Sequence, residues 1–464
     1  MVPSTFSEEK SLNVPRLEKQ LGIEVYASPS LGIGGKIRQF SEDFVVEEVL
    51  IDGSKAEISP IETQQLVGKG RYLICVLVKR DWDTFLAVRK VARRLGISPK
   101  RIQIAGIKDA HALTAQHISI RRITPEQVSR VKIKDITLRP LRFSEEMVFS
   151  QLLLGNQFRV LIRAISHTSS VTERRVKKVQ SELLSLGGVP NFFGHQRFGT
   201  VRPITHLVGR SITKGDWKNA ALIFLAQPSP HEHPAAREAR QQLRDTRNFG
   251  EALRLFPRYL RYEQMMLTHL NKQPKDFVGA FRKLPLKLRR IFVQAYQSFL
   301  FNRFLSQRIL RSIPINEAQV GDYLVSLDNQ GIPTDEFTLV TGQSLSHVKK
   351  ALNECKMRVA IPLLGFKQNP SEGIQGEIEQ EIIETENVVS RNFYVPLMPE
   401  ISAPGRLRAI LAPIIDLSIE GPTKDSANPP KQEIELNFTL HRGSYATVLL
   451  REFMKPRDLI KAGF

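Results

Sequence analysis

Cysteine is nearly absent from this 464-residue chain: Cys75 and Cys355 are the only two, far apart and without a CxxC pair. A disulfide framework, a zinc ribbon and a cysteine-ligated iron–sulfur cluster are therefore excluded, and a reducing compartment fits. Cys75 lies in the apolar run 72–78 and is predicted to be a small core residue. No segment approaches the roughly 18–20 apolar residues of a membrane span, and the N-terminus lacks a signal-peptide core. We therefore expect no membrane partner and a cytoplasmic location.

The common nucleotide-binding, hydrolase and metal motifs are also missing. The glycines at 32–35 lack the Ser or Thr of a P-loop, and 342–346 lacks the final glycine of a nucleophile elbow. The histidines in the Pro-rich loop 231–233 have no Cys or second pair to complete a zinc site. The sequence therefore predicts no metal site and no nucleotide cofactor. Residue type alone leaves open a hydrolase that uses His111 or His117.

Positive charge, by contrast, is abundant. Lys and Arg number 67 against 47 Asp and Glu, which gives a net charge of +20, and hydrophobic residues make up an ordinary globular 41%. Such an excess does not choose a fold, but it favours polyanionic partners, either nucleic acid or an anionic membrane surface. The length allows two to three domains.

Up to about residue 190, hydrophobic spacing alternates between strand-like and helix-like segments. The continuous apolar run 72–78 predicts a strand covered on both faces. Apolar residues at helical spacing over 82–95 predict a helix capped by Asp81 or Asp83. Further strands are expected at 102–104, 118–120 and 158–163, followed by a helix with Ser170 and Glu173 at capping-box spacing and Gly187-Gly188 at its end.

The pattern changes after about residue 200. Pro285 is expected to open a long helix with a wide apolar face, whereas 365–390 is rich in Gly and Glu and poorly patterned. A strand over 434–440 and a helix over 444–454 are predicted near the end of the sequence. This pair is too small to bury its own core, so it should pack on an existing sheet. We therefore favour a first domain interrupted by a second over two unrelated domains in series.

The segment 105–116 carries the most informative chemistry. Its sequence AGIKDAHALTAQ places a Lys-Asp pair, Lys108 and Asp109, on the connection between two predicted strands. Strand ends and loops are where catalytic carboxylates tend to be presented. The alternative is that Asp109 merely begins a turn or caps a helical turn, and spacing alone favours that alternative slightly.

Three further segments combine glycine, aromatic and amide residues: 38–47 (RQFSEDFVVE), 155–158 (GNQF) and 188–199 (GVPNFFGHQRFG). An aromatic ring can stack on a base, an Asn amide can read its polar edge, and Arg can hold a phosphate or a carboxylate. Each segment alone is more typical of a core aromatic residue next to a turn.

Taken together, these four segments resemble the TruD family of tRNA pseudouridine synthases, most closely its archaeal-type members, and RGSYATVLLR at 442–451 matches too. The resemblance implies an α+β fold. In that fold a pseudouridine-synthase catalytic domain, with a mainly antiparallel mixed sheet and flanking helices, is interrupted by an inserted family-specific α/β domain. The expected boundaries are 1–187 for the first part of the catalytic domain, 188–412 for the insertion and 413–464 for the C-terminal part.

The resemblance also implies roles for individual residues. Asp109 falls on the catalytic aspartate of the family, and Phe158 falls on the aromatic residue expected to stack on the target uracil. The other positions implied to contact the substrate are Arg38, Phe44, Lys108 and Asn156.

Two positions depart from the family pattern. Arg38 stands where lysine is common, which keeps the charge but changes its geometry, and Ser41 stands where proline is common. We expect Arg38, assisted by Lys108, to keep the Asp109 carboxylate charged when a docked base excludes water.

The partner implied is tRNA, with uridine-13 as the target. Because the reaction is an isomerisation without net redox change or hydrolysis, it needs no cofactor and no metal. The competing hypothesis is a non-catalytic RNA-binding or RNA-remodelling protein on the same scaffold; a monomer is expected in either case. Candidate phosphate contacts, each of which is otherwise typical of a solvated helix face, are Arg197, Arg282, Lys283, Lys287, Arg289 and Arg290, together with Arg174, Lys177 and Lys178.

Overall fold

The computed structural model describes residues 13–59 and 69–464, which form two compact units. One unit comprises Ser28–Val189, apart from 60–68, together with Ala412–Phe464; we call it the sheet unit. The other comprises residues 13–27 and Pro190–Leu411; we call it the inserted unit. The chain passes between them after Ala27 and again within the short strands β7 (Val189–Pro190) and β12 (Leu411–Ala412).

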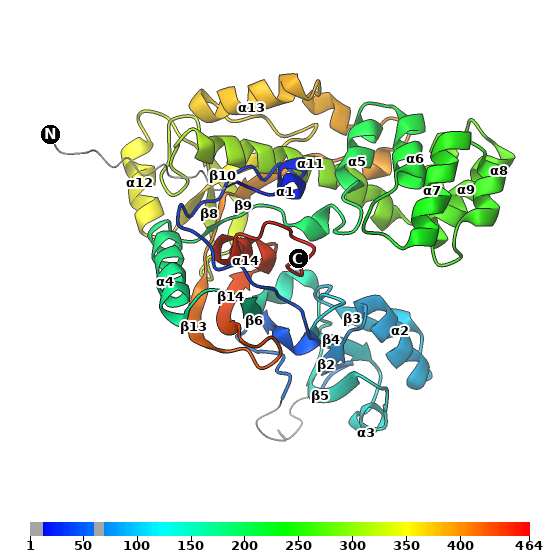
Figure 1. Cartoon of the computed structure of the whole chain (residues 1–464), viewed down its shortest axis with the longest axis horizontal. Helices are drawn as coiled ribbons and strands as arrows, with labels where there is room; N and C mark the ends of the chain where they lie inside the picture. Colours follow the sequence, from blue (N-terminus) through cyan, green and yellow to red (C-terminus); the bar gives the residue numbers. More distant parts are fainter. Residues whose placement is uncertain (1–12, 60–68) are drawn as a thin grey trace. The chain divides into compact units, whose positions relative to one another are not determined.

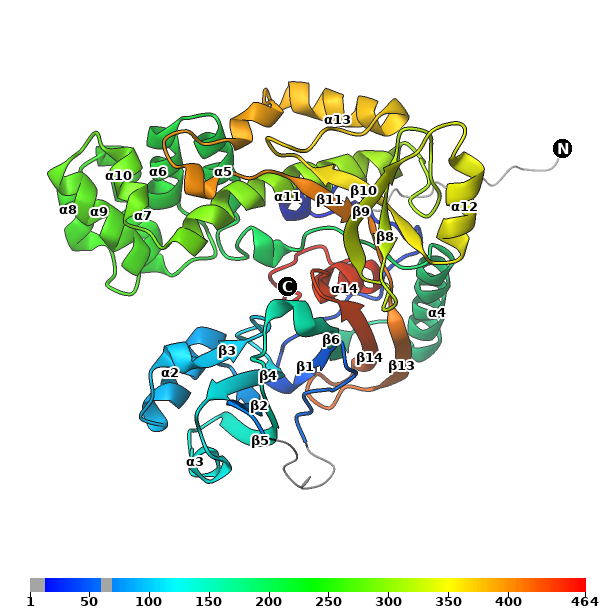
Figure 2. The same cartoon turned by 180° about the vertical axis from the view of Figure 1, so that it is seen from behind.

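The sheet unit is built on one eight-stranded sheet with the strand order β13-β14-β6-β1-β4-β2-β5, in which β3 also pairs with β4 (Figures 1 and 2). Only β1 and β4 run parallel among these neighbouring pairs. The predicted mainly antiparallel mixed sheet of an α+β fold is therefore confirmed. The strands are β1 (Phe44–Leu50), β2 (Tyr72–Arg80), β3 (Ile102–Ile104), β4 (Leu113–Arg121), β5 (Ile136–Ser144), β6 (Leu153–Ile165), β13 (Ile415–Lys424) and β14 (Gln432–His441).

The helices α2 (Thr84–Arg94), α3 (Pro125–Ser129), α4 (Ser169–Ser185) and α14 (Ala446–Met454) flank this sheet. The Asp83 side chain accepts a hydrogen bond from Leu86 N, so the predicted cap of α2 is confirmed. The predicted capping box of α4 is wrong. That helix begins at Ser169 with Thr168 as its N-cap, two residues before the expected N-cap Ser170, and Thr168 makes no side-chain capping bond.

The C-terminal strand and helix pack on the existing sheet, as predicted. Strand β14 pairs with β6 so that Phe438 lies directly opposite Phe158. Buried residues of β14 and α14, among them Leu436 and Leu449, belong to the core of this unit. The reason is the one that the sequence suggested: two elements alone cannot remove their apolar faces from water.

The inserted unit is rich in helices and carries a four-stranded antiparallel sheet in the order β11-β10-β8-β9. Its longest helix, α11 (Leu286–Leu310), begins after Pro285, as predicted. The strands are β8 (Tyr323–Leu327), β9 (Pro333–Leu339), β10 (Met357–Leu363) and β11 (Arg406–Ala409). The other helices are α1 (Arg16–Gln20), α5 (Thr205–Thr213), α6 (Trp217–Ala226), α7 (Pro234–Thr246), α8 (Phe249–Leu255), α9 (Arg261–Lys272), α10 (Phe277–Arg282), α12 (Leu345–Asn353) and α13 (Gly373–Thr385).

Helix α13 lies along α11 (Figures 1 and 2) and falls in the segment 365–390, for which no regular pattern was expected. Its buried Ile378 and Ile382 are four residues apart, which is the spacing of one helix face. The buried Glu379 beside them and the glycines at 373 and 376 conceal that pattern in the sequence.

Residues 13–27 belong to the inserted unit, whereas we expected them with the first part of the catalytic domain. The physical reason is their bonding to α11. The Asn302 amide donates to Leu21 O at 3.0 Å, and the Ser306 hydroxyl donates to Gly22 O at 2.8 Å.

None of the helices in the described part of the chain combines the length and apolar character needed to cross a membrane.

Candidate active site

Asp109 lies on the loop between β3 and β4, and the backbone of this loop is fixed from two sides. The Thr84 hydroxyl, at the first residue of α2, accepts from Lys108 N at 3.1 Å and lies 3.2 Å from Lys108 O. The buried Lys79 ammonium, at the end of β2, donates to Asp109 O at 2.5 Å. These bonds hold the backbone in place while the Asp109 side chain stays 33% exposed.

The Arg38 guanidinium pairs with the Asp109 carboxylate, with Nη2 at 3.1 Å from Oδ1. It also lies over the Phe44 ring, 4.0 Å from the ring centroid, and Nη1 donates to Gly463 O at 3.3 Å. Burial lowers the pKa of Arg38, and the negative charge of Asp109 opposes that shift. Arg38 has a left-handed backbone, with φ 56°, which is uncommon for a residue with a side chain. The structure therefore brings Arg38, Phe44 and Asp109 together, as the sequence predicts.

Lys108 has different partners from those expected. Its ammonium lies 2.8 Å from Glu48 Oε1 and donates to Asn156 Oδ1 at 2.6 Å. With only 3% of its side chain exposed, Lys108 is a buried link between β1, where Glu48 lies, and β6, where Asn156 lies. Its charge is thus balanced by Glu48, and Arg38 is the cation that pairs with Asp109.

Glu48 is a buried acid that sequence reasoning missed. Burial raises the pKa of its carboxyl group, but hydrogen bonds from His117 and Lys108 and the charge of Lys108 outweigh that effect, so its pKa is lowered. Its Oε2 also accepts from His117 N at 2.8 Å. The available signal was an acidic residue inside the apolar strand VVEEVL, which indicates a buried charge but not its partner.

Three aromatic rings form a row beside these residues. The Phe44 and Phe158 rings meet edge to face, with centroids 6.1 Å apart, and Phe158 stacks on Phe438 at 5.3 Å. Phe158 is 5% exposed, so the residue expected to stack on uracil is a buried ring with Phe438 along one face. Sequence reasoning missed Phe438 because its position opposite Phe158 depends on the pairing of two strands far apart in the chain.

The predicted phosphate contacts from 282–290 lie in the inserted unit, and three of them bind the segment 397–400. Arg282 donates to Leu397 O at 2.8 Å, Arg290 donates to Glu400 O at 2.9 Å, and Arg289 pairs with the Glu400 carboxylate. The other two candidates in this segment, Lys283 and Lys287, are exposed. Arg197 donates to the Ser298 hydroxyl. Arg174, Lys177 and Lys178 are exposed on α4, and Lys177 pairs there with Glu173.

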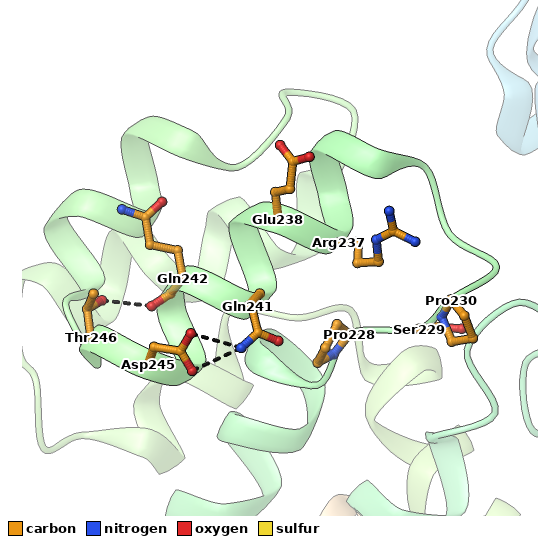
Figure 3. Close-up of a pocket in the computed structure, with 9 residues that line it drawn as sticks. All are labelled: Pro228, Ser229, Pro230, Arg237, Glu238, Gln241, Gln242, Asp245 and Thr246. Atoms are coloured by element: carbon orange, nitrogen blue, oxygen red, sulfur yellow. Dashed lines mark hydrogen bonds between the residues drawn. The ribbon is translucent and has the colours of Figure 1, made fainter.

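A cavity of about 670 Å³ lies between the loop 228–230 and α7 in the inserted unit (Figure 3). On its wall the Gln241 amide donates to both carboxylate oxygens of Asp245. None of the predicted site residues lines this cavity. Within residues 13–59 and 69–464 no three His, Cys, Asp or Glu side chains gather as a metal site would require.

An aspartate on a loop, paired with an arginine beside aromatic rings in a strongly basic α+β protein, fits an enzyme that acts on RNA, because aromatic rings can stack on bases and positive charge attracts a polyanion. The family model described as "tRNA pseudouridine synthase D (TruD)" matches residues 20–453. This chain belongs to the TruD family, which is a family of isomerases.

Individual relatives agree with this assignment and are archaeal, as the sequence resemblance indicated. A protein of Methanosarcina mazei named "Probable tRNA pseudouridine synthase D" is 39% identical over 449 residues, 97% of this chain and 99% of the relative. A relative of the same name from Thermococcus onnurineus is 38% identical and covers 93% of this chain and 97% of its own. A crystal structure of a TruD protein from M. mazei superimposes with a TM-score of 0.81 at 39% identity, covering 95% of this chain and 98% of that one.

Proposed function

We propose that this protein isomerises a uridine of tRNA, at position 13, to pseudouridine, with the Asp109 carboxylate as the catalytic group. Membership of the TruD family supports the reaction, and the resemblance of the sequence motifs supports the position. The single observation that carries the residue assignment is the geometry of Asp109. Lys79 holds its backbone carbonyl and Thr84 holds the backbone of the preceding Lys108, while the Asp109 carboxylate is one-third exposed beside Arg38.

Pseudouridine formation breaks the bond between the ribose and N1 of the uracil, turns the uracil and forms a bond between the ribose and C5; the proton on C5 is then lost and N1 gains a proton, so the product is an isomer of the substrate. In this series of steps, a carboxylate next to the sugar–base junction serves as nucleophile or as base. A docked base would exclude water and disfavour the charged carboxylate, and the Arg38 guanidinium 3.1 Å away opposes that effect. Arg38 thus keeps Asp109 reactive at the moment when the site closes.

The target uridine also has to leave the RNA stack, which costs a few kcal/mol. Stacking on an aromatic ring offsets about 1–3 kcal/mol of that cost. Phe158 is the proposed ring, and Asn156 beside it is the proposed contact to the polar edge of the base. Because Phe158 is 5% exposed, the entering base has to displace part of what covers the ring.

The test replaces Asp109 by Asn or by Ala. Either change removes the negative charge, so pseudouridine formation in tRNA should fall to background while tRNA binding changes only modestly. Mapping of pseudouridine by chemical modification and primer extension measures the first quantity, and filter binding measures the second. Asp335→Asn, an exposed acid on β9, is the matched control and should behave as wild type. Full turnover by either Asp109 variant would overturn the assignment.

The same mapping on bulk tRNA with the wild-type protein tests the proposed reaction and position at once. Pseudouridine at another position would contradict the proposed target. No pseudouridine at any position, together with tight tRNA binding, would favour the non-catalytic RNA-binding alternative. The expected monomer and cytoplasmic location rest on the sequence and stay predictions.

A further inference from the structure

Helix α2 has one face on the sheet and one face toward solvent. Ala87, Val88, Val91 and Ala92 are buried against apolar residues of the strands, including Cys75 and Ile118. On the other face Phe85 and Leu86 are 45% and 51% exposed, Arg89, Arg93 and Arg94 are exposed, and Lys90 is half-buried. We call this set of residues the α2 face: Phe85, Leu86, Arg89, Lys90, Arg93 and Arg94.

The α2 face begins next to the loop between β3 and β4 that carries Asp109, which we call the candidate catalytic loop. Thr84, immediately before Phe85, is hydrogen-bonded to both backbone groups of Lys108, which precedes Asp109. Ile107 on the same loop is 63% exposed. The apolar side chains of the face thus lie next to the loop. Its cations lie further along the helix, about 8 to 15 Å from Thr84 along the helix axis at 1.5 Å per residue.

The cations of the α2 face have no ion-pair partner within residues 13–59 and 69–464. Among the described residues, no carboxylate forms an ion pair with Arg89, Lys90, Arg93 or Arg94, in contrast to Arg289, which pairs with Glu400. Four like charges on neighbouring helical turns repel one another. The surrounding segment 80–135 carries thirteen Lys and Arg against five Asp and Glu, so the local field favours a polyanion.

We propose that the α2 face binds the RNA strand that flanks the target uridine. Arg89, Arg93 and Arg94 contact its phosphates, while Phe85, Leu86 and Ile107 cover the ribose or base that is partly unstacked when its neighbour is extruded. This inference rests on the proposed function for the location of the reacting nucleotide. This order, with apolar side chains near the reacting nucleotide and cations further away, matches what such an RNA strand presents. Unstacked bases gain from apolar contact, whereas the backbone needs only positive charge.

The test is the double variant R89A/R93A. Each phosphate contact adds roughly 0.7–0.9 to the slope of log K against log salt. The variant should therefore lower that slope by about 1.4–1.8 and raise the tRNA Kd roughly 25- to 60-fold at 0.1 M salt. KM for tRNA should rise in parallel, and kcat at saturating tRNA should not change. Ile107→Ala removes apolar area but no charge, so it should raise KM without altering the slope.

The matched control is K349A/K350A, which removes the same charge from the exposed side of α12. Its tRNA Kd and slope should equal those of wild type. An unchanged slope in R89A/R93A, or an equal loss in both double variants, would overturn the proposal, since the second result would mean a general electrostatic effect.

The result also separates this inference from the proposed function. A wild-type protein that binds tRNA through the α2 face but forms no pseudouridine would overturn the proposed reaction and leave the binding surface standing. Pseudouridine formation by the R89A/R93A variant with the KM of wild type would overturn the α2 face as a binding surface and leave the proposed reaction standing. Thermal unfolding of each variant shows whether the fold is retained.

Discussion

Lys79 is a buried residue that holds the loop of Asp109 through a hydrogen bond to the Asp109 backbone carbonyl. Burial lowers the pKa of its ammonium to about 8, against the opposing charges of Asp109, Asp83 and Asp81, while Lys108 lowers it further. Its bond to Asp109 O is strong while Lys79 is charged and weakens when the proton leaves. Lys79 is therefore a positioning residue whose protonation is linked to the geometry of the loop.

We predict that activity falls as the pH rises through about 8, because Lys79 then loses its charge. Lys79→Arg keeps a charge at every accessible pH, so its alkaline limb should move upward. Lys79→Met should be slow at all pH values. Single-turnover rates from pH 6 to 10 measure these profiles. Equal alkaline limbs for wild type and Lys79→Arg would contradict the prediction.

Stability should respond to Lys79 in the opposite direction. Between about 8 and the ordinary value of 10.5, the unfolded chain binds the Lys79 proton more tightly than the folded protein does. Titration of Lys79 therefore raises the free energy of unfolding with pH in this window. In thermal melts of wild type and Lys79→Met, the difference between the two proteins should favour wild type increasingly above pH 8. A loss of activity caused by unfolding would show the opposite trend.

Phe158 offers a separate test at the residue scale. Phe158→Leu keeps an apolar side chain but removes the π-face, so loss of about 1–3 kcal/mol of stacking should lower kcat/KM roughly 5- to 150-fold. Phe304→Leu, at a fully buried position in the inserted unit, controls for the packing cost alone and should keep wild-type activity. Steady-state kinetics on tRNA measures both. Wild-type kcat/KM in Phe158→Leu would show that the ring only supports Phe44 and Phe438.

At the scale of elements, the site depends on a turn near the end of the sequence. Residues 459–464 hold the segment that carries Arg38. Ile37 N donates to Ala462 O at 2.9 Å, and Arg38 donates to Gly463 O at 3.3 Å. Gly463 has φ +86°, and a Cβ there would lie 2.0 Å from Ile37 O. Only glycine lets this turn approach residues 37 and 38 so closely.

Gly463→Ala should therefore push residues 37–38 away from Asp109 and lower kcat at least tenfold, with little change in tRNA affinity. Gly187→Ala is the matched control, because Gly187 has a similar φ of +78° with nothing within 4 Å of an added Cβ. It carries the same backbone strain, about 1–2 kcal/mol, without the clash. Single-turnover rates and melting temperatures of both variants check the prediction. Equal kcat in the two variants would mean that the turn does not position Arg38.

For the whole molecule, the net charge of +20 should dominate the encounter with tRNA. Four phosphate contacts would raise the tRNA Kd roughly 50- to 150-fold between 50 and 200 mM salt. Filter binding over this salt range measures the slope. A Kd that is constant over this range would contradict electrostatic binding by the basic surfaces and would leave shape and base contacts as the source of affinity.

Much of the local structure could be predicted because the information lies in neighbouring residues. The apolar run 72–78 and the helical spacing over 82–95 each define a buried face, and the observed β2 and α2 follow them. Helix α13 was missed where two glycines and a buried Glu379 interrupt the pattern. Burial raises the pKa of Glu379 to about 7, against hydrogen bonds from Ser371 and Gln375. No rule of periodicity predicts a buried acid of this kind.

The sequence by itself determined the strongly basic character of the protein, its family, and the placement of Asp109, Arg38 and Phe44 in motifs of that family. Only the tertiary structure decided their partners. Arg38 meets Gly463, which is 425 residues away, and Phe158 meets Phe438 through the pairing of β6 with β14. Periodicity and capping act over a few residues, whereas hydrogen bonds and ring contacts between distant segments depend on strand register and on how the loops close over the sheet.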